Sequence, residues 1–268
     1  MFSIISQVFN FILDYTIGFI LKAIFKILAF ILPSEYTLII TKFSGAFWSG
    51  IKNTMYIALL GTILGFLIAM VLGSIRTIKI KEKDSKARKI WKVIVQSLVK
   101  TYVTVFRGTP MIVQAMIIYY GLVEFIHWDP VTAGLFTVTI NTGAYLTEVV
   151  KDGILSVDNG QYEAARSLGF SHLRTMLLII FPQALKNSIS SIGNEFVINI
   201  KDTSVLNVIS CAEMFFVLKA STAVDYNYME QMITGAIIYL ILTYSTTKVL
   251  HLIEKKLDAP VVELKGSN

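Results

Sequence analysis

The chain has 268 residues, of which 54% are hydrophobic and 16% are charged, and its mean hydropathy is +0.65. Soluble domains carry about 25% charged residues, so this composition indicates a protein that resides mainly in lipid. The net charge of +6 gathers between apolar runs, as in membrane proteins, and does not indicate binding to nucleic acid. The single cysteine, Cys211, excludes an intrachain disulfide and a four-cysteine metal site.

Apolar runs long enough to cross about 30 Å of hydrocarbon predict five membrane-spanning helices. Their approximate ranges are 53–75, 108–126, 131–150, 186–209 and 231–253. Residues 93–106 come just before the helix-start signal Thr109-Pro110, and we interpret them as an interfacial helix. The apolar stretch 4–32 carries polar residues at helical spacing, which fits either a span or an interfacial helix. The sequence thus predicts an all-α polytopic membrane protein with a five-helix core and an additional N-terminal hydrophobic or amphipathic helix.

The distribution of basic residues predicts the orientation of these spans. Residues 76–92 contain eight Lys or Arg and only two acidic residues, which is typical of a cytoplasmic loop. Alternation then places residues 151–186 and the C-terminus in the cytoplasm. The segments around Asp129 and between Glu213 and Glu230 fall on the other side.

No motif in the sequence indicates catalysis. The nearest approach to a phosphate-binding loop, Gly45 to Gly50, is followed by Ile51 where lysine is required. The three histidines have no metal-ligand spacing. We therefore expect a protein that is not an enzyme and that binds no cofactor or metal of its own.

The segment with Glu163, Ala164, Ala165, Gly169 and Pro182 predicts a surface on which another protein docks. Small alanine side chains on one exposed turn would let a partner approach closely, and Glu163 would offer a charge-assisted contact. Gly169 would end one helix so that a second can begin. This pattern favours a protein that receives its energy from a partner.

Polar side chains also interrupt two of the predicted spans. They are Asn141, Tyr145 and Glu148 in the third span and Lys201, Asp202 and Thr203 in the fourth. The first three are spaced i, i+4 and i+7, so they share one helix face, which should face the bundle interior. The six residues could form a charge network in which Glu148 or Asp202 neutralises Lys201 or Arg107, or a polar translocation route, and the sequence favours neither alternative.

Several motifs resemble those of one transporter family. The run from Gly160 to Gly169, followed by Ile179, Phe181 and Pro182, resembles the coupling loop of binding-protein-dependent ABC importer permeases. Three further stretches resemble the polar amino acid uptake branch of that family. They are 106–110 with Gln114, 141–145 with Glu148, and 201–204. The similarity extends from about residue 44 to 256, with Phe181 and Lys151 replacing the more usual Leu and Arg.

The resemblance implies a permease domain at 44–256 with its coupling loop at 151–186, preceded by segment 1–43 and followed by a cytoplasmic tail at 257–268. Such a permease lies in the bacterial inner or plasma membrane, pairs with itself or a related permease, and binds two cytoplasmic ATPase subunits that hold ATP and Mg. It receives an amino acid from an extracytoplasmic binding protein and translocates it by alternating access. Arg107, Gly108, Thr109 and Pro110 would serve gating or structure.

Two alternatives to an amino acid importer remain. The first is a related ABC importer for methionine or an osmolyte. The second is an ion-coupled secondary transporter, which could use Asp202 and Glu148 but would have no need of a docking loop.

Overall fold

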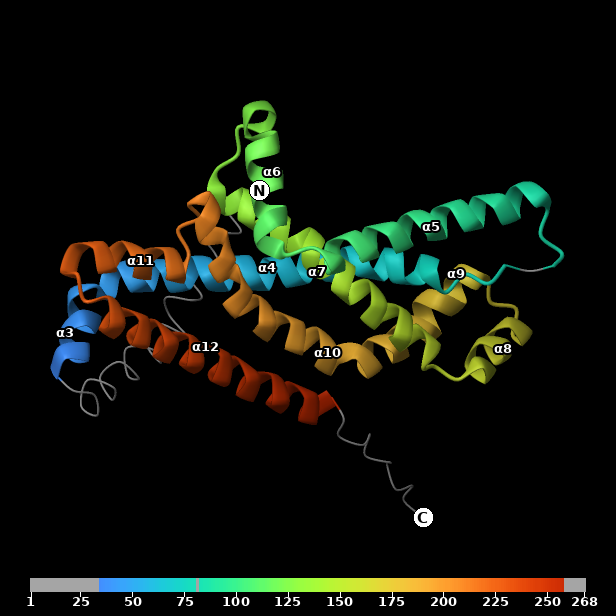
Figure 1. Cartoon of the computed structure of the whole chain (residues 1–268). Coiled ribbons are helices and arrows are strands. Elements are labelled where there is room, and N and C mark those ends of the chain that lie inside the picture. Colours follow the sequence, from blue (N-terminus) through green and yellow to red (C-terminus); the bar gives the residue numbers. More distant parts are fainter. Residues whose placement is uncertain (1–33, 81, 258–268) are drawn as a thin grey trace, which may run out of the picture.

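The computed structural model describes residues 34–80 and 82–257, which form helices and connecting turns without a strand (Figure 1). The elements are α3 (Ser34–Lys42), α4 (Ser44–Arg76), α5 (Lys86–Gly108), α6 (Met111–Ile126), α7 (Pro130–Leu155), α8 (Asn159–Ser167), α9 (His172–Thr175), the π-helix η2 (Met176–Ile180), α10 (Phe181–Asp202), the 3-10 helix η3 (Thr203–Ile209), α11 (Met214–Asp225) and α12 (Tyr228–Leu257). The N-terminal segment predicted at 4–32 and the tail after residue 257 lie outside the described residues.

The predicted spans 53–75, 131–150 and 231–253 each lie within one helix, 108–126 falls mainly on α6, and 186–209 covers α10 and η3, which confirms the all-α membrane fold. By length and composition, α4 and α12 are the described helices that could each cross a membrane alone. The number rises to four if each of two bent helix pairs counts as one span. One pair is α5 with α6, and the other joins residues 172–209 to α11. α7, which contains the predicted span 131–150, is instead enclosed by its neighbours over more than half of its residues.

The longest apolar helix, α4, runs through the whole core. Near its start, Phe47 packs in a cluster with residues of α10, α11 and α12. Ile57, in its middle, packs with α6, α7 and η3, and Ala69, near its end, packs with α7 and α10. α4 therefore serves as the axis against which the other helices are arranged.

The closest packing joins α4 to α7. A Cβ atom added at Gly65 would lie 3.0 Å from the Thr139 carbonyl oxygen and 3.0 Å from the Gly143 nitrogen. In lipid, helices gain stability from such close backbone approach, because the solvent supplies little hydrophobic driving force. Gly65 is thus required by the spacing of the two helices.

The structure corrects the predicted arrangement before the second span. Residues 93–106 belong to the longer helix α5, which begins at Lys86 and runs beside α4 in Figure 1 instead of lying across it. At Gly108-Thr109-Pro110 the chain turns by 108° into α6. Proline at this position has no N–H for a continuing helix and restricts the residue before it, so the predicted break is confirmed while the predicted bounds are wrong.

The fourth predicted span also has different bounds. α10 begins at Phe181 and ends at Asp202, after which η3 continues to Ile209 with tighter turns. Ser210 then adopts a left-handed conformation, with φ of 60°, and the chain bends by 56° into α11. Lys201 and Asp202 therefore lie at the end of a helix and do not interrupt one.

Candidate docking surface and polar face

The predicted docking residues lie on the short helix α8 at one end of the molecule (Figure 1). The Asp158 side chain caps this helix by accepting a hydrogen bond from Gly160 N at 2.6 Å. Glu163 and Ala164 are exposed, as predicted, but Ala165 is only 2% exposed. The expectation that both alanines face a partner is wrong for Ala165, because that side of α8 packs on the protein itself. The exposed turn is therefore formed by Glu163 and Ala164.

Gly169 ends α8 as the sequence predicts. Its φ is +85°, a conformation that side chains with a Cβ rarely adopt. The Gly169 N–H donates to Arg166 O at 3.1 Å, and the Phe170 N–H donates to Ala165 O at 3.1 Å. This is the hydrogen-bond pattern of a Schellman motif, which satisfies the last carbonyl groups of a helix. The reversal leaves Leu168 79% exposed beside the Glu163 turn.

Pro182 explains the irregular backbone that follows. It is the second residue of α10 and has no N–H, so the usual hydrogen bond to the carbonyl of residue 178 cannot form. The preceding turn instead widens into η2, where the Phe181 N–H donates to Met176 O. π-helical turns of this kind are frequent at functional sites. Pro182 thus shapes the connection between α8 and α10. It lies on α10 and is not part of the exposed turn of Glu163 and Ala164.

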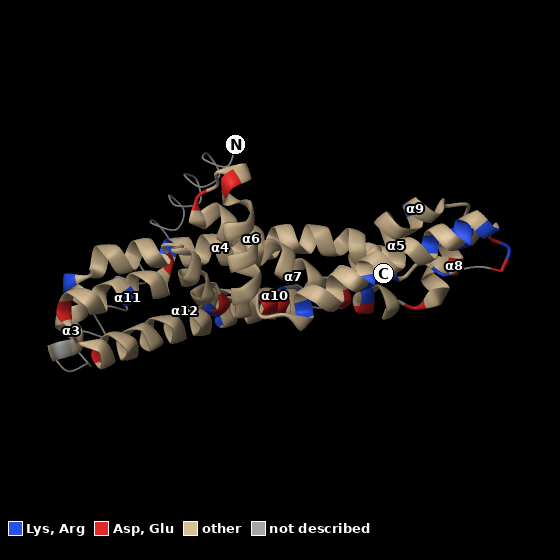
Figure 2. Cartoon of the chain, turned by 45° about the horizontal axis from the view of Figure 1, so that its top comes forward, with Lys and Arg blue, Asp and Glu red and all other residues tan. Residues whose placement is uncertain are grey.

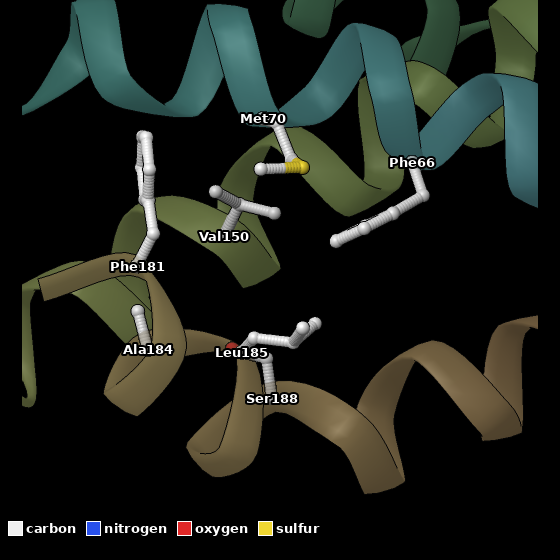
Figure 3. Close-up of a pocket in the computed structure, with 7 residues that line it drawn as sticks. All are labelled: Phe66, Met70, Val150, Phe181, Ala184, Leu185 and Ser188. Atoms are coloured by element: carbon white, nitrogen blue, oxygen red, sulfur yellow. The ribbon is translucent and has the colours of Figure 1, made fainter. Parts of the chain in front are cut away.

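The start of α10 is fastened to the end of α7. The Asn187 side chain donates to Ser156 Oγ at 2.8 Å, and a Cβ added at Gly153 would lie 3.0 Å from Ala184 O. Beside this contact, a small apolar hollow lies between α4, α7 and α10, with Phe66, Val150 and Phe181 among its lining residues (Figure 3). Residues 156–181, which include α8, are thus attached to the core by the contacts between the end of α7 and the start of α10.

The residues predicted to serve gating or structure form the elbow between α5 and α6. Gln114 Nε2 donates to the Phe106 carbonyl at 2.9 Å and to the Thr109 carbonyl at 3.0 Å. Asn141 on α7 donates to Gln114 Oε1 at 2.9 Å and to Phe106 O at 3.3 Å. Gly108 and Pro110 are exposed at the outside of this turn. Asn141 therefore faces the interior, as predicted, where it holds the elbow against α7.

The next two residues on that helix face do not share its environment. Tyr145 is 37% exposed, and the Arg107 guanidinium lies 5.2 Å from the centre of its ring. Glu148 is partly buried and pairs with Arg76 at 3.0 Å and Lys151 at 2.7 Å. Among the described residues Glu148 thus forms its ion pairs with cations that were not predicted, while Arg107 acts on Glu148 electrostatically without an ion pair. The cations that pair with Glu148 are Arg76, at the end of α4, and Lys151, one turn further along α7.

The three residues predicted on the fourth span lie in different surroundings. Thr203 is fully buried and donates to Ile200 O at 3.0 Å. Lys201 lines a hollow between α10, α11 and α12 together with Tyr239. Asp202 interacts electrostatically with Lys201 and also with Glu195. Asp202 therefore lies within electrostatic range of both a cation and a second carboxyl group.

Two residues of α10 were missed by sequence reasoning. Glu195 lies one heptad before Asp202 and is within electrostatic range of Asp202 and Arg107. Asn199 is 3% exposed and donates to Thr62 Oγ1 and Thr142 Oγ1, both at 2.9 Å. The criterion that singled out Lys201, a polar residue within an apolar run, would have found both. Arg107, Tyr145, Glu195 and Asp202, which we call the polar face, come from α5, α7 and α10.

No cluster of three or more His, Cys, Asp or Glu side chains within residues 34–80 and 82–257 is arranged to hold a metal ion. The chemistry available at the polar face is therefore hydrogen bonding and charge complementarity.

Known proteins share both the sequence and this fold. Residues 87–259 match the family described as binding-protein-dependent transport system inner membrane component. The L-cystine transport system permease protein TcyB of Bacillus subtilis (strain 168) is 33% identical over 223 residues, which cover 81% of this chain and 91% of TcyB. The glutamine transport system permease protein GlnP of Escherichia coli (strain K12) is 33% identical over 211 residues, covering 78% of this chain and 91% of GlnP.

Two solved structures are also similar. A crystal structure of an amino acid ABC transporter with histidines matches with a TM-score of 0.69 at 33% identity, covering 81% of this chain and 96% of that chain. An inward-facing crystal form of the MetNI methionine ABC transporter matches with a TM-score of 0.68 at 16% identity, covering 81% of this chain and 98% of that one. At 16% identity the likeness concerns the fold alone.

The apolar helices and the similarity to transport proteins define an integral membrane permease. The chain belongs to the family of inner membrane components of binding-protein-dependent transport systems. It is the transport subunit of an ABC importer, and the ATPase is a separate subunit.

Proposed function

We propose that this chain imports polar amino acids, together with a second permease subunit, two cytoplasmic ATPase subunits and an extracytoplasmic binding protein. Support comes from relatives whose names specify cystine, glutamine and arginine, at 31–33% identity. The methionine alternative has weaker support, because the likeness to the methionine transporter rests on 16% identity. The chain itself would bind no cofactor, and ATP and Mg would be held by the ATPase subunits.

The proposed orientation places α8, the hairpin between α4 and α5, and the C-terminus in the cytoplasm. Residues 76–92 have a large excess of Lys and Arg, which favours retention on that side. α8 and the start of α5 lie at the same end of the molecule in Figure 1, as this orientation requires. Attachment of an ATPase also tests it, because only a cytoplasmic α8 can meet that partner.

The observation that carries the coupling proposal is the exposed turn of Glu163 and Ala164, held by the Gly169 cap. The small Ala164 side chain permits close approach, Glu163 supplies a charge, and Leu168 adds apolar area beside them. When ATP closes the ATPase dimer, movement of α8 would pass to α7 and α10 through the contacts between the end of α7 and the start of α10. This motion would tilt the helices and open the route to the opposite side.

Replacing Gly169 with valine tests this coupling surface. We expect ATPase copurification and ATP-driven amino acid uptake in sealed vesicles to fall about fivefold or more, since a β-branched residue strongly resists a positive φ. Gly169→Asn is the matched control, because asparagine tolerates the left-handed conformation far better and should retain most of both activities. Normal coupling in Gly169→Val at normal abundance would rule out α8 as the coupling element.

We further propose that the polar face lines the route of the amino acid. A zwitterion carries a carboxylate and an ammonium group, and both need polar partners once water is removed. Arg107 is placed to meet the carboxylate, and Glu195 or Asp202 the ammonium group, while Tyr145 offers a hydroxyl. Glu148, one helical turn after Tyr145 on α7, would attract the Arg107 guanidinium electrostatically. Asn141 and Thr203 would hold the surrounding helices, and Lys201 would act from the separate hollow beside α11 and α12.

The variants Glu195→Gln and Asp202→Asn test this route. Each keeps the size of the side chain but removes the charge, so we expect uptake to fall about tenfold, as for loss of one hydrogen bond to a charged group. Abundance and ATPase attachment should persist, because both residues are only partly buried and lie far from α8. Lys201→Met, at the hollow beside α11 and α12, is the comparison and should reduce uptake less. Unchanged uptake in both acid variants would remove the polar face from the route.

A further inference from the structure

The hairpin between α4 and α5 carries most of the positive charge of the chain, and the proposed transport mechanism does not use it. Residues 79–92 contain seven basic and two acidic residues, a net charge of +5 out of +6 for the whole chain. Figure 2 shows Lys and Arg gathered at the start of α5, at the same end of the molecule as α8. In Figure 1 this part of α5 projects beyond the end of α4.

Side chains of the hairpin itself hold it in position. Lys92 Nζ donates to Asp84 Oδ2 at 2.6 Å and to the Lys79 carbonyl at 3.1 Å. Gln96 Nε2 donates to the Ile78 carbonyl at 2.7 Å, so this carbonyl group, just after the end of α4, has a hydrogen-bond donor. Asp84 also lies 3.9 Å from the Arg88 guanidinium. The Asp84 carboxylate is therefore neutralised within the hairpin.

Three lysines of the hairpin can meet an external anion. Lys79, Lys83 and Lys86 are exposed, and no described residue forms an ion pair with any of them. Lys79 comes from one arm of the hairpin and Lys83 and Lys86 from the other, and the hydrogen bonds of Lys92 and Gln96 join these two arms.

A stripe of apolar side chains begins beside these lysines and continues along α5. Ile90, Trp91, Ile94 and Leu98 recur at helical spacing and are 59%, 67%, 46% and 65% exposed. The opposite side of the helix buries Val99 against the core. A basic end joined to an exposed tryptophan and an apolar stripe is typical of a helix that contacts headgroups and acyl chains together.

We propose that Lys79, Lys83, Lys86 and Trp91 form a binding surface for anionic phospholipid headgroups of the cytoplasmic leaflet. This inference rests on the orientation given under the proposed function. A lipid fits better than the ATPase, because the apolar stripe leads from the lysines along α5 toward the elbow, as acyl chains extend from a headgroup. The exposed turn on α8 already provides the surface for the ATPase.

Quenching of Trp91 fluorescence measures this contact directly. The full-length permease carrying Trp48→Phe and Trp128→Phe retains Trp91 as its single tryptophan. It would be placed in nanodiscs of phosphatidylglycerol and phosphatidylcholine in which one lipid or the other has brominated acyl chains. At equal mole fractions we expect brominated phosphatidylglycerol to quench more strongly, and we expect added salt to reduce the difference.

The triple variant Lys79→Gln/Lys83→Gln/Lys86→Gln should abolish this preference. One basic residue near an anionic surface strengthens binding about fivefold, so the loss of three corresponds to about a hundredfold. The matched control is Lys248→Gln/Lys255→Gln/Lys256→Gln, which removes three exposed lysines from α12 and should keep the preference.

Equal quenching by the two lipids in the protein with native lysines would overturn the proposal, as would a preference that survives in the hairpin variant. Loss of ATPase copurification in the hairpin variant with its lipid preference intact would assign the surface to the ATPase instead. The quenching needs neither ATPase nor substrate, so it can fail while the coupling test on Gly169 succeeds, and the reverse.

Discussion

The substitution Asn199→Asp is expected to remove most of the folded permease from the membrane. Asn199 is 3% exposed, and its amide group donates to Thr62 and Thr142, which come from α4 and α7. Aspartate has no N–H groups for these bonds, and no cation lies among its hydrogen-bond partners. A carboxylate buried in this way costs about 3 kcal/mol or more, which is a large part of the stability of a domain.

Thermal unfolding in detergent and the abundance of the inserted protein measure this effect. Asn194→Asp is the matched control, since Asn194 lies on the same helix and is exposed. It should leave both quantities nearly unchanged. If Asn199→Asp unfolded at the same temperature as the native protein, the buried contact among α4, α7 and α10 would not support the fold.

The second large effect is expected for Gly65→Val, which tests the packing of α4 on α7. A Cβ at this position would lie 3.0 Å from backbone atoms of Thr139 and Gly143, and backbone cannot move aside as a flexible side chain can. The two helices would have to separate along their closest contact. Overpacking of this kind costs about 1 to 3 kcal/mol, and here each further carbon of valine adds to it.

The melting temperature and uptake of Gly65→Val should therefore fall together. Gly45→Val provides the control on the same helix, because a Cβ at Gly45 would meet no atom within 4 Å. Equal stability of the two variants would mean that α4 and α7 lie further apart than the structure places them.

The two substitutions test two kinds of contact in the region where α4, α7 and α10 meet. Asn199 joins three helices by hydrogen bonds, and Gly65 joins two of them by close packing. Thr62, the α4 partner of Asn199, lies about one helical turn from Gly65, so both contacts belong to one region of the core.

Patterns that are local in the chain could be read from the sequence alone. Apolar runs determined the helices and the membrane class, the glycine at 169 determined the end of α8, and proline at 110 determined the break before α6. Each of these depends on composition or on backbone geometry within a few residues. The charge excess of residues 76–92 likewise needed no knowledge of the fold.

Only the tertiary structure decided which of these groups meet. Glu148 pairs with Arg76 because α4 ends beside α7, and Ala165 is buried because α8 folds back on the protein. Lys201 lines the hollow beside α11 and α12, and Asp202 interacts electrostatically with both Lys201 and Glu195. Contacts between helices depend on their crossing angles and rotations, which hydrophobic periodicity alone does not specify.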